Sequence, residues 1–435
     1  MTPSRPPIRI AVLGAGTVGA EVAHQLLEHR AEFEARIGAP ITLAGIGVRR
    51  IDAPRSPELP ESLLTTDTTS LVLGAHIVIE LIGGVEQARE LVLLALDSGA
   101  DVVTGNKALL ATHGPELFAA AERVGAQLNY EAAVGGAIPI IRPLRDSLAG
   151  DHVRRILGIV NGTTNFVLDR MDEQGVGFEE ALAEATRLGY AEADPTGDVS
   201  GADAAQKAAI LAGLAFHTTV PLEKVAVEGI TRVTSGQVRA ARAAGQVVKL
   251  LAICERITAP DGTEGVSVRV YPALLPRTHP LAAVRGANNA VFVQAASAGD
   301  LMFYGAGAGG PETASAVLGD LVSAARRHVI GGPGLIGPAG ADLPVLDPGV
   351  VETRYQITLA VRDEPGVLAR LAGIVSEHGV SIETVEQSRG GEDGTASLVV
   401  GTHRAREAAL AATVAALGDA PEVGAVLGVL RVEGE

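Results

Sequence analysis

Residues 8–19 read IRIAVLGAGTVG, and this stretch decides the fold of the N-terminal half. Its first six residues are a short apolar run rich in β-branched side chains, as in a strand buried in a parallel sheet. They run directly into a GxGxxG motif, and an amphipathic stretch at residues 20–35 follows. The motif comprises Gly14, Gly16, Thr17, Val18 and Gly19. Strand, glycine turn and helix together predict a dinucleotide site, in which backbone N–H groups meet a pyrophosphate. The alternative is a tight turn that uses glycine for steric reasons alone.

The alternation of strand and helix continues after this motif. Strands are predicted at residues 41–48, 76–81 and 101–104, and a helix at residues 85–98. This order is typical of a doubly wound parallel sheet, so the sequence predicts an α/β fold of the Rossmann type.

Two arginines end the second predicted strand. An NAD-preferring fold tends to place an acidic residue there for the ribose 2′-hydroxyl, whereas Arg49 and Arg50 suit a 2′-phosphate. The sequence therefore favours NADP over NAD. The alternative is a pair of solvated arginines at a strand end.

Polar groups also follow the strand at residues 101–104. Thr104, Gly105, Asn106 and Lys107 lie at the C-terminal edge of a parallel strand, which faces the crevice where such folds bind ligands. Lys107 is therefore a candidate site residue. Further on, residues 129–139 predict a strand entering a glycine-rich turn, whose carbonyl groups would be free to coordinate a hard cation.

The stretch GYAEADPTGDVSGADAAQK, residues 189–207, concentrates groups capable of acid–base chemistry. Its first half predicts a loop because of Pro195 and Gly197, and Ser200 is expected to cap a helix that runs to Phe216. Asp203 and Lys207 then lie one turn apart on one helical face. Such a pair is often a surface salt bridge. On an otherwise apolar, alanine-rich helix, however, a partly buried lysine facing carboxylates indicates a proton-transfer site.

From about residue 154 the sequence pattern changes to strands and helices without the dinucleotide-binding motif. A strand at residues 156–160 enters a small polar loop, Asn161 to Asn165, which could donate hydrogen bonds to a compact ligand. A helix is predicted at residues 178–188 and strands at residues 225–233, 247–255 and 266–271. The glycine-rich residues 305–311 precede a helix at 313–328, and they indicate either close approach to a cofactor or a hinge.

The C-terminal part has a pattern of its own. Residues 331–347 are rich in glycine and proline and predict a linker. The predicted elements beyond it spell βαββαβ, a ferredoxin-like module. They are strands at 354–361, 380–387, 396–402 and 423–432, and helices at 365–378 and 405–417.

Composition limits the classes of function. The 435 residues carry a formal net charge of −16, which argues against nucleic acid or an anionic membrane as partner. A single cysteine, Cys254, excludes an internal disulfide framework and a cysteine-cluster metal site. We also find no apolar run of membrane-spanning length and no signal-peptide pattern at residues 1–7, so we expect a cytoplasmic protein.

Taken together, these motifs resemble the homoserine dehydrogenase family over essentially the whole chain. The most specific match is residues 189–207, joined by the fingerprint at 14–19 and by residues 103–107, 131–139 and 161–165. The terminal module, with VRDEPGVL at residues 361–368, resembles an ACT domain, a small regulatory fold that often binds amino acids. One departure is Gly105, where an alanine is common in the family.

The resemblance implies roles for individual residues. Lys207 matches the proton-transferring lysine and Lys107 a second lysine near the nicotinamide. Glu192 and Asp203 match the carboxylates that hold the amino alcohol, with Gly189 and Asp198 in the same substrate stretch. Gly307 matches a late glycine that touches the cofactor. The carbonyls that hold a structural sodium ion in the family match Glu131, Val134, Gly136 and Ile138.

The implied activity is the reversible NAD(P)H-dependent reduction of L-aspartate 4-semialdehyde to L-homoserine, in threonine, methionine and isoleucine biosynthesis. We expect an NAD(P)-binding domain at residues 1–138, completed by a helix around 311–330, and a catalytic domain at 139–310. A linker at 331–353 and an ACT domain at 354–435 would follow, with a homodimer or homotetramer as the assembly and an effector such as threonine. The alternatives are a non-catalytic amino-acid and nucleotide sensor, and another nicotinamide-dependent dehydrogenase of a small amino alcohol.

Overall fold

The computed structural model describes residues 6–331, 337, 340–389 and 395–434. The chain divides into two compact units. The first comprises Met1–Val153, Gln206–Glu223 and Asn289–Asp342, and the second Arg154–Ala205, Lys224–Asn288 and Leu343–Glu435.

The first unit is built on a parallel sheet with the order β3-β2-β1-β4-β5-β6. Its strands are β1 (Ile8–Leu13), β2 (Ile41–Gly47), β3 (Leu64–Thr65), β4 (Ile77–Glu80), β5 (Asp101–Thr104) and β6 (Leu128–Asn129). The central strands are buried on both faces, which explains their nearly continuous apolar sequences. This order confirms the predicted doubly wound sheet.

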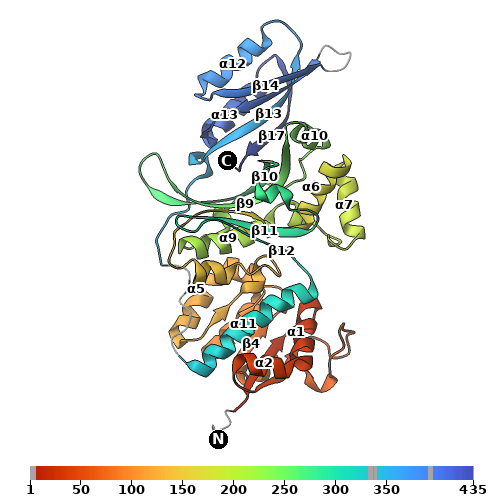
Figure 1. The fold of residues 1–435 in the computed structure, drawn as a ribbon, viewed down its shortest axis with the longest axis vertical. Helices are drawn as coiled ribbons and strands as arrows, with labels where there is room; N and C mark the ends of the chain where they lie inside the picture. The colour runs from red at the N-terminus through yellow and green to blue at the C-terminus, as the bar shows by residue number, and fades with distance from the viewer. Residues whose placement is uncertain (1–5, 332–336, 338–339, 390–394, 435) are drawn as a thin grey trace. The chain divides into compact units, whose positions relative to one another are not determined.

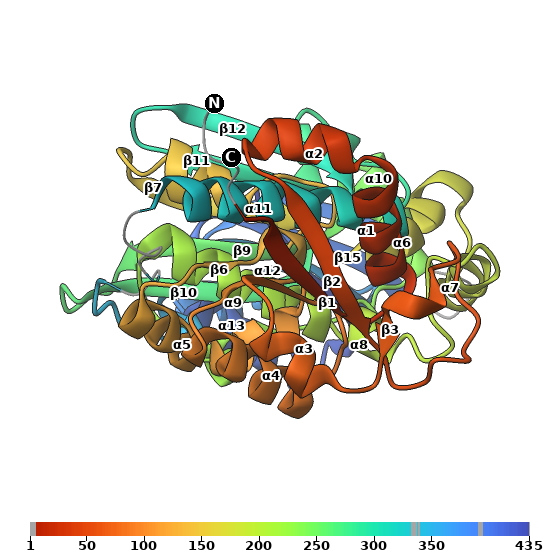
Figure 2. The ribbon, with the colours of Figure 1, turned by 90° about the horizontal axis from the view of Figure 1, so that it is seen from below.

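Helices cover both faces of this sheet (Figure 2). Helices α1 (Thr17–Glu28), α2 (Arg30–Ile37) and α11 (Gly310–Ile330) pack together on one face, and α3 (Thr68–Leu73), α4 (Glu86–Asp97) and α5 (Lys107–Val124) on the other. Val317 and Leu321 of α11 share a core with Ile10 and Ile77 of the sheet. The single helix expected at residues 20–35 is wrong in one respect, because the chain departs from helical geometry at His29.

The first unit also holds two strands that the sequence did not predict, β11 (Asn288–Ala295) and its neighbour β12 (Gly299–Ala306). Strand β12 includes Gly305 and Ala306, so the expected glycine loop is shorter than predicted.

The second unit contains a mixed sheet. Strands β7 (Val153–Ile159), β9 (Gln246–Thr258) and β10 (Glu264–Pro276) pair antiparallel, and β9 and β10 are longer than predicted. The strand expected at residues 225–233 is wrong beyond β8 (Ala226–Val227). The chain leaves the sheet there because the N–H of Ile230 donates to the carbonyl of Val199 (2.9 Å). Gly229 lies so close to this carbonyl that a Cβ would be 2.2 Å from its oxygen.

The helices of the second unit include a correction. The polar segment Asn161 to Asn165 is no loop: Asn161 caps helix α6 (Gly162–Gln174), and residues 162–165 form its first turn. Helix α8 (Thr196–Val199) interrupts the loop expected before Ser200. The other helices are α7 (Phe178–Arg187), α10 (Ser235–Ala243) and α9 (Ala202–Phe216), which continues into the first unit.

The terminal module has the predicted βαββαβ order (Figure 1). It consists of β13 (Glu352–Arg362), α12 (Val367–Glu377), β14 (Ile382–Arg389), β15 (Thr395–Thr402), α13 (Glu407–Gly418) and β17 (Val423–Val432), with β16 (Ala405–Arg406) beside β13. Its antiparallel strands lie in the order β17-β13-β15-β14. Strand β17 also pairs with β10 in parallel, so the module shares a sheet with the preceding strands.

Short helical turns complete the fold. They are η1 (Glu61–Leu63), η2 (Glu131–Ala133), η3 (Pro143–Ser147), η4 (Leu222–Lys224), η5 (Pro280–Ala283) and η6 (Pro348–Val350). Of the linker predicted at residues 331–347, residues 332–336 and 338–339 lie outside the described residues. Near its end, Val266 exchanges backbone hydrogen bonds with Pro344 and Leu346.

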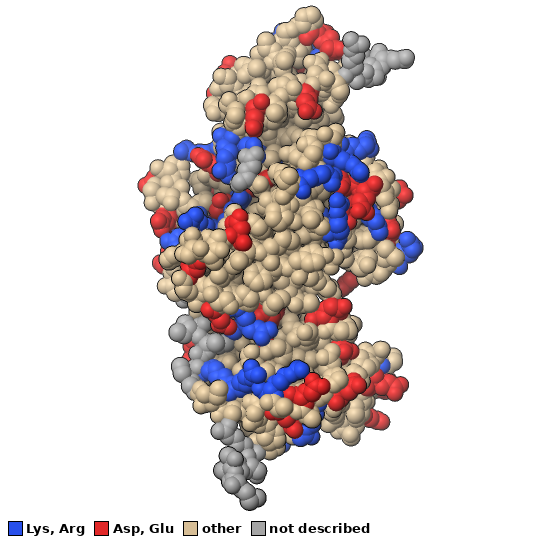
Figure 3. Space-filling view, in the orientation of Figure 1, with Lys and Arg blue, Asp and Glu red and all other residues tan. Residues whose placement is uncertain are grey.

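The distribution of charged side chains and the hydropathy of the helices can be compared with the composition. Basic and acidic side chains are interspersed over the face that Figure 3 shows, in a chain whose net charge is −16. Among the described residues, we find no helix that is both long and apolar enough to cross a bilayer.

Candidate active site

The glycine motif forms one wall of a cavity of about 800 Å³ in the first unit. Gly14 has a φ of 99°, and a Cβ there would lie 2.4 Å from the carbonyl oxygen of Leu81. A Cβ on Gly19 would lie 2.2 Å from the oxygen of Gly14. Gly16 has nothing within 4 Å of such a Cβ and stands at the N-terminus of α1 without a side-chain cap. Packing therefore requires two of the glycines, and the third leaves the first N–H groups of α1 accessible to a ligand.

Three arginines line the same cavity. Arg49 and Arg50 are exposed and follow the end of β2. Arg55 was not predicted, and its guanidinium donates to the carbonyls of Ile51 (2.8 Å), Ala53 (2.7 Å) and Arg50. Arg55 thus fixes the loop that carries the other two arginines.

The predicted Lys107 begins helix α5, and a buried carboxylate organises the residues before it. The hydroxyl of Thr104 donates to Glu80 (2.6 Å) and accepts from the N–H of Asn106 (3.0 Å). Asn106 in turn caps α5 by accepting from the N–H of Leu109 (3.0 Å). Burial raises the pKa of Glu80, although its hydrogen bonds act in the opposite direction. Lys107 is therefore the first residue of a helix whose N-terminus is held, through Thr104 and Asn106, by Glu80 of β4.

The glycine-rich turn after β6 is organised by Glu131. Its carboxylate accepts from the N–H groups of Ile140 (2.6 Å), Ile141 (2.8 Å) and Arg142 (3.0 Å) and from the Arg142 side chain (2.9 Å). With four donors on its side chain, Glu131 has only its main-chain carbonyl left to offer a cation.

Gly307 packs against this turn. A Cβ on Gly136 would lie 2.5 Å from the carbonyl of Gly307, and the N–H of Ala137 donates to Ala306 (3.0 Å). On its other side, Gly307 lies against the amide of Asn289. Both polar atoms of that amide are buried and have no hydrogen-bond partner among the described residues. The structure thus brings Gly307 beside the predicted cation turn.

In the second unit, two predicted carboxylates meet at one amide. The Nδ2 of Asn161 donates to Oδ1 of Asp198 (2.7 Å) and to Oδ2 of Asp203 (2.9 Å). The hydroxyl of Thr163 lies within hydrogen-bond distance of the other oxygen of Asp198 (2.9 Å) and of the carbonyl of Tyr190 (2.6 Å). The sequence predicts Asn161 in a polar loop and does not connect it to these aspartates.

The remaining predicted residues lie on the same segment. Gly189 follows α7 with a φ of 80°, a conformation that favours glycine, and Glu192 is exposed in the bend that follows. The hydroxyl of Ser200 accepts from the N–H of Ala202 (3.4 Å), the first residue of α9. Lys207 is half-buried on α9, one turn beyond Asp203.

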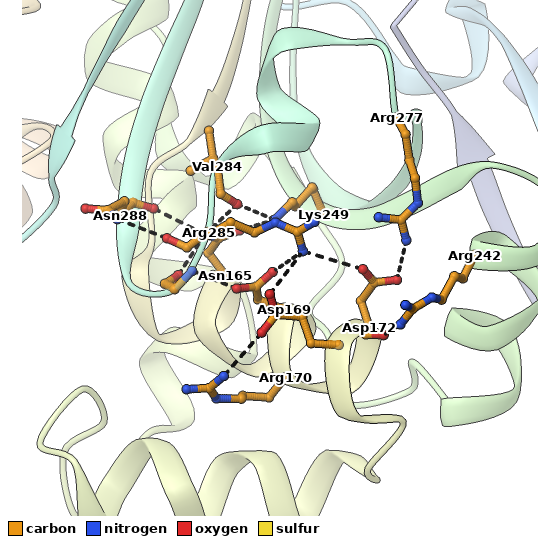
Figure 4. Close-up of polar contacts among 12 residues, drawn as sticks. Asn165, Asp169, Arg170, Asp172, Arg242, Lys249, Arg277, Val284, Arg285 and Asn288 are labelled. Carbon is orange, nitrogen blue, oxygen red and sulfur yellow. Dashed lines mark hydrogen bonds and ion pairs between the residues drawn. The ribbon is translucent and has the colours of Figure 1, made fainter.

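A network of charged side chains contacts α6 (Figure 4). Lys249 is fully buried and donates to Asn165 (2.9 Å) and to the carbonyl of Val284 (2.6 Å). Burial lowers the pKa of Lys249 to about 8, although the nearby Asp169 acts in the opposite direction. Asp169 itself accepts from Arg285 (2.7 Å).

Comparison with known proteins decides the family. A profile described as "Homoserine dehydrogenase" matches residues 139–322, the NAD-binding domain of the same family matches 14–131, and an ACT domain profile matches 355–422. Homoserine dehydrogenase from Corynebacterium glutamicum is 51% identical over 428 residues, covering 98% of this chain and 96% of its own. The chain belongs to the homoserine dehydrogenase family.

Solved homoserine dehydrogenases agree with the fold. The enzyme from Thiobacillus denitrificans superposes with a TM-score of 0.92 at 38% identity over 99% of both chains. A hyperthermophilic archaeal homoserine dehydrogenase in complex with NADPH has a TM-score of 0.62 at 27% identity, covering 75% of this chain and 99% of its own. The predicted family, the α/β fold with a terminal ACT domain and the NAD(P)-dependent oxidoreductase class are therefore confirmed.

The site residues predicted for this homoserine dehydrogenase form separate groups in the structure. Gly14, Gly16, Arg49 and Arg50 line one cavity, and Asp198 and Asp203 share one amide. Sequence reasoning missed Glu80, although a lone acidic residue at the end of an apolar strand was a signal. It also missed the N-cap pattern of Asn161, in which an asparagine precedes a helix by one residue.

Proposed function

We propose that this chain catalyses the reversible reduction of L-aspartate 4-semialdehyde to L-homoserine with NAD(P)H, as a cytoplasmic enzyme of amino-acid biosynthesis. The observation that carries the proposal is the pair Asp198 and Asp203, bound to one amide, with Lys207 one helical turn further along α9. The test is an assay of NADPH oxidation with the semialdehyde. A chain that binds nucleotide and homoserine without turnover would instead be a sensor.

The residues have distinct roles in this proposal. A bound nicotinamide supplies or receives the hydride at the carbon that carries the substrate oxygen. Lys207 gives a proton to that oxygen during reduction and takes it back during oxidation. Gly189, Glu192, Asp198 and Asp203 hold the ammonium end of the amino alcohol, which explains the acidic residues near the lysine. Lys107 contributes a positive charge near the nicotinamide.

We propose NADP as the preferred cofactor, held by the glycine motif, Thr104 and Gly307, with Arg49 and Arg50 on the 2′-phosphate. Replacing both arginines with alanine is expected to raise the KM for NADPH roughly 10- to 100-fold, because charge-assisted hydrogen bonds are lost. The KM for NADH should change little and serves as the internal control. Equal weakening of the two cofactors, measured by steady-state kinetics, would show that the arginines read something other than the phosphate.

We also propose a structural sodium ion, bound by the main-chain carbonyls of Glu131, Val134, Gly136 and Ile138. Two features support it. The Glu131 side chain is already saturated with donors, so the carbonyls are the ligands that remain. The unpartnered amide of Asn289 lies beside Gly307, next to this turn. Oxygen donors of this kind suit a hard cation.

The domain limits given in the sequence analysis stay a prediction. We propose that the ACT domain binds an amino-acid effector, with threonine as the leading candidate. Gly366 ends the turn before α12 with a φ of 88° and no side-chain cap, which leaves N–H groups for a carboxylate. Threonine is expected to shift the homoserine saturation curve, since allosteric coupling is typically about 1–3 kcal/mol. If threonine, isoleucine, methionine and lysine all leave the curve unchanged, the module only supports assembly, as a homodimer or homotetramer.

A further inference from the structure

The amide of Asn161 uses both of its hydrogens on carboxylates. One nitrogen donates at 2.7 Å to Asp198 and at 2.9 Å to Asp203, so the two acceptor oxygens cannot be farther apart than the sum of these distances. An asparagine amide nitrogen has two hydrogens, and here each has an anionic acceptor. Asn161 is only 5% exposed, so water does not readily replace this bridge.

The bridge connects two consecutive helices. Asp198 belongs to the short helix α8 and Asp203 to the first turn of α9, and Gly201 bends the chain between them with a φ of 86°. Two carboxylates at this spacing repel each other. Without a shared donor, the bend at Gly201 would allow them to move apart.

The other end of the same amide is fixed as well. The Oδ1 of Asn161 accepts from the N–H (2.9 Å) and hydroxyl (2.9 Å) of Thr164, which caps α6. One turn beyond Asn161, Asn165 accepts from the buried Lys249 (2.9 Å; Figure 4). Asn165 also donates to the carbonyl of Gly286 (2.8 Å). The first turn of α6 is therefore anchored from inside the unit, and Asn161 projects from a rigid support.

We propose that Asn161 is a positioning residue for the substrate ammonium: its nitrogen sets the separation and direction of Asp198 and Asp203, while its oxygen caps α6. This inference rests on the proposed function, in which these aspartates receive the amino group of homoserine. Asn161 itself need not touch the substrate. Its two roles use different atoms of one amide, so they can be separated by substitution.

The variant Asn161→Asp makes this separation. The new carboxylate keeps an acceptor for Thr164 and remains a good N-cap, but it has no hydrogen to give to the aspartates. The KM for homoserine is expected to rise roughly 10- to 100-fold, because hydrogen bonds to charged groups are lost. The turnover number should fall less, since ammonium binding is present in both ground and transition states.

The pH dependence gives a second readout. Three carboxylates would then face one another at residues 161, 198 and 203, with Lys207 one turn away and the hydroxyl of Thr163 on Asp198. Protonation of this group returns one O–H donor to the bridge, and like charges favour proton uptake. The ratio of variant to wild-type KM is therefore expected to fall as the pH is lowered. A residue that only caps a helix would not change this ratio.

Two further variants complete the experiment. Asn161→Ser keeps a cap oxygen without adding charge, so its KM should rise with no recovery at low pH. Asp67→Asn exchanges carboxylate and amide at the exposed N-cap of α3, where the acceptor for Ser70 is retained, and should leave the homoserine KM unchanged. Circular dichroism and NADPH binding confirm folding of each variant.

The outcomes separate this inference from the proposed function. If the wild-type chain oxidises homoserine and Asn161→Asp keeps the wild-type KM at every pH, the amide only caps α6 and the inference is wrong. If the wild-type chain does not oxidise homoserine with either cofactor, the proposed function fails first.

Discussion

Replacing Lys207 with alanine is expected to lower kcat for homoserine oxidation by roughly 10²- to 10⁴-fold, with little change in KM. A proton-transfer role stabilises the transition state selectively, which is why the turnover number should carry the loss. Lys207 is half-buried on α9 among alanines, one turn from Asp203, so few other groups on this helix could substitute for it. Steady-state kinetics in both directions measure the effect.

Lys207→Arg distinguishes charge from proton transfer. Arginine keeps the positive charge but does not give up its proton at ordinary pH, so a proton-transfer role predicts a loss close to that of alanine. Lys224→Ala, at an exposed lysine in η4, is the matched control and should be silent. Glu192→Gln should mainly raise KM. Suppose that Glu192→Gln lowers kcat strongly at normal KM while Lys207→Ala keeps a near-normal kcat. Proton transfer would then be assigned to Glu192 and substrate binding to Lys207.

Much of the fold could be predicted because local pattern and burial agree. The apolar strands of the first sheet and the βαββαβ order of the terminal module follow directly from periodicity, and both are confirmed. The errors lie where tertiary contacts overrode local preference. Residues 225–233 have a strand-like composition, yet Ile230 gives its N–H to Val199 instead of a strand neighbour.

The site could be predicted less completely, for a different physical reason. Residue types and spacing identify carboxylates and lysines, but they do not show which distant group holds each one. Asn161 donates to both Asp198 and Asp203 from 37 and 42 residues away, and its small polar neighbours predicted a loop. In the same way, Glu80 contacts Thr104 across neighbouring parallel strands, a pairing that only the sheet order reveals.

A second large effect is expected from Glu433→Gln, within the second unit, where strand β17 of the ACT module pairs with β10. Glu433 is 5% exposed, beyond β17, and accepts from the side chain of Arg155 and from the hydroxyl of Tyr271 (2.6 Å). Arg269, 3% exposed on β10, lies in the same group and bonds Glu255 (2.7 Å). Removing Glu433 leaves Arg155 and Arg269 with one carboxylate fewer, Glu255 remaining, and breaking a buried ion pair typically costs about 3–5 kcal/mol. The free energy of unfolding of the second unit should fall by that order.

The pH dependence of this loss has a definite sign. Burial alone would raise the pKa of Glu433, but the charges of Arg155 and Arg269 and the hydrogen bonds outweigh it, so the pKa lies below its ordinary value. A lowered pKa in the folded state contributes stability that is present above the unfolded pKa, roughly 4.3 for Glu, and is lost as pH falls through the folded value. The stability difference between wild type and Glu433→Gln should therefore be constant from about pH 8 to about pH 5 and shrink only below that range.

Urea unfolding followed by circular dichroism measures this difference, with Glu264→Gln as the matched control. Glu264 pairs with Arg256 on the surface (2.8 Å), where both side chains are about half exposed, and such pairs contribute little. Equal unfolding midpoints for the two variants would contradict the buried-pair argument. The same network bears on truncation: a chain ended near Gly340 loses β17 and Glu433 together, leaving Arg155 and Arg269 buried without that carboxylate. Loss of activity on truncation would then report unfolding, so regulation by the ACT module is better tested with effectors on the full chain.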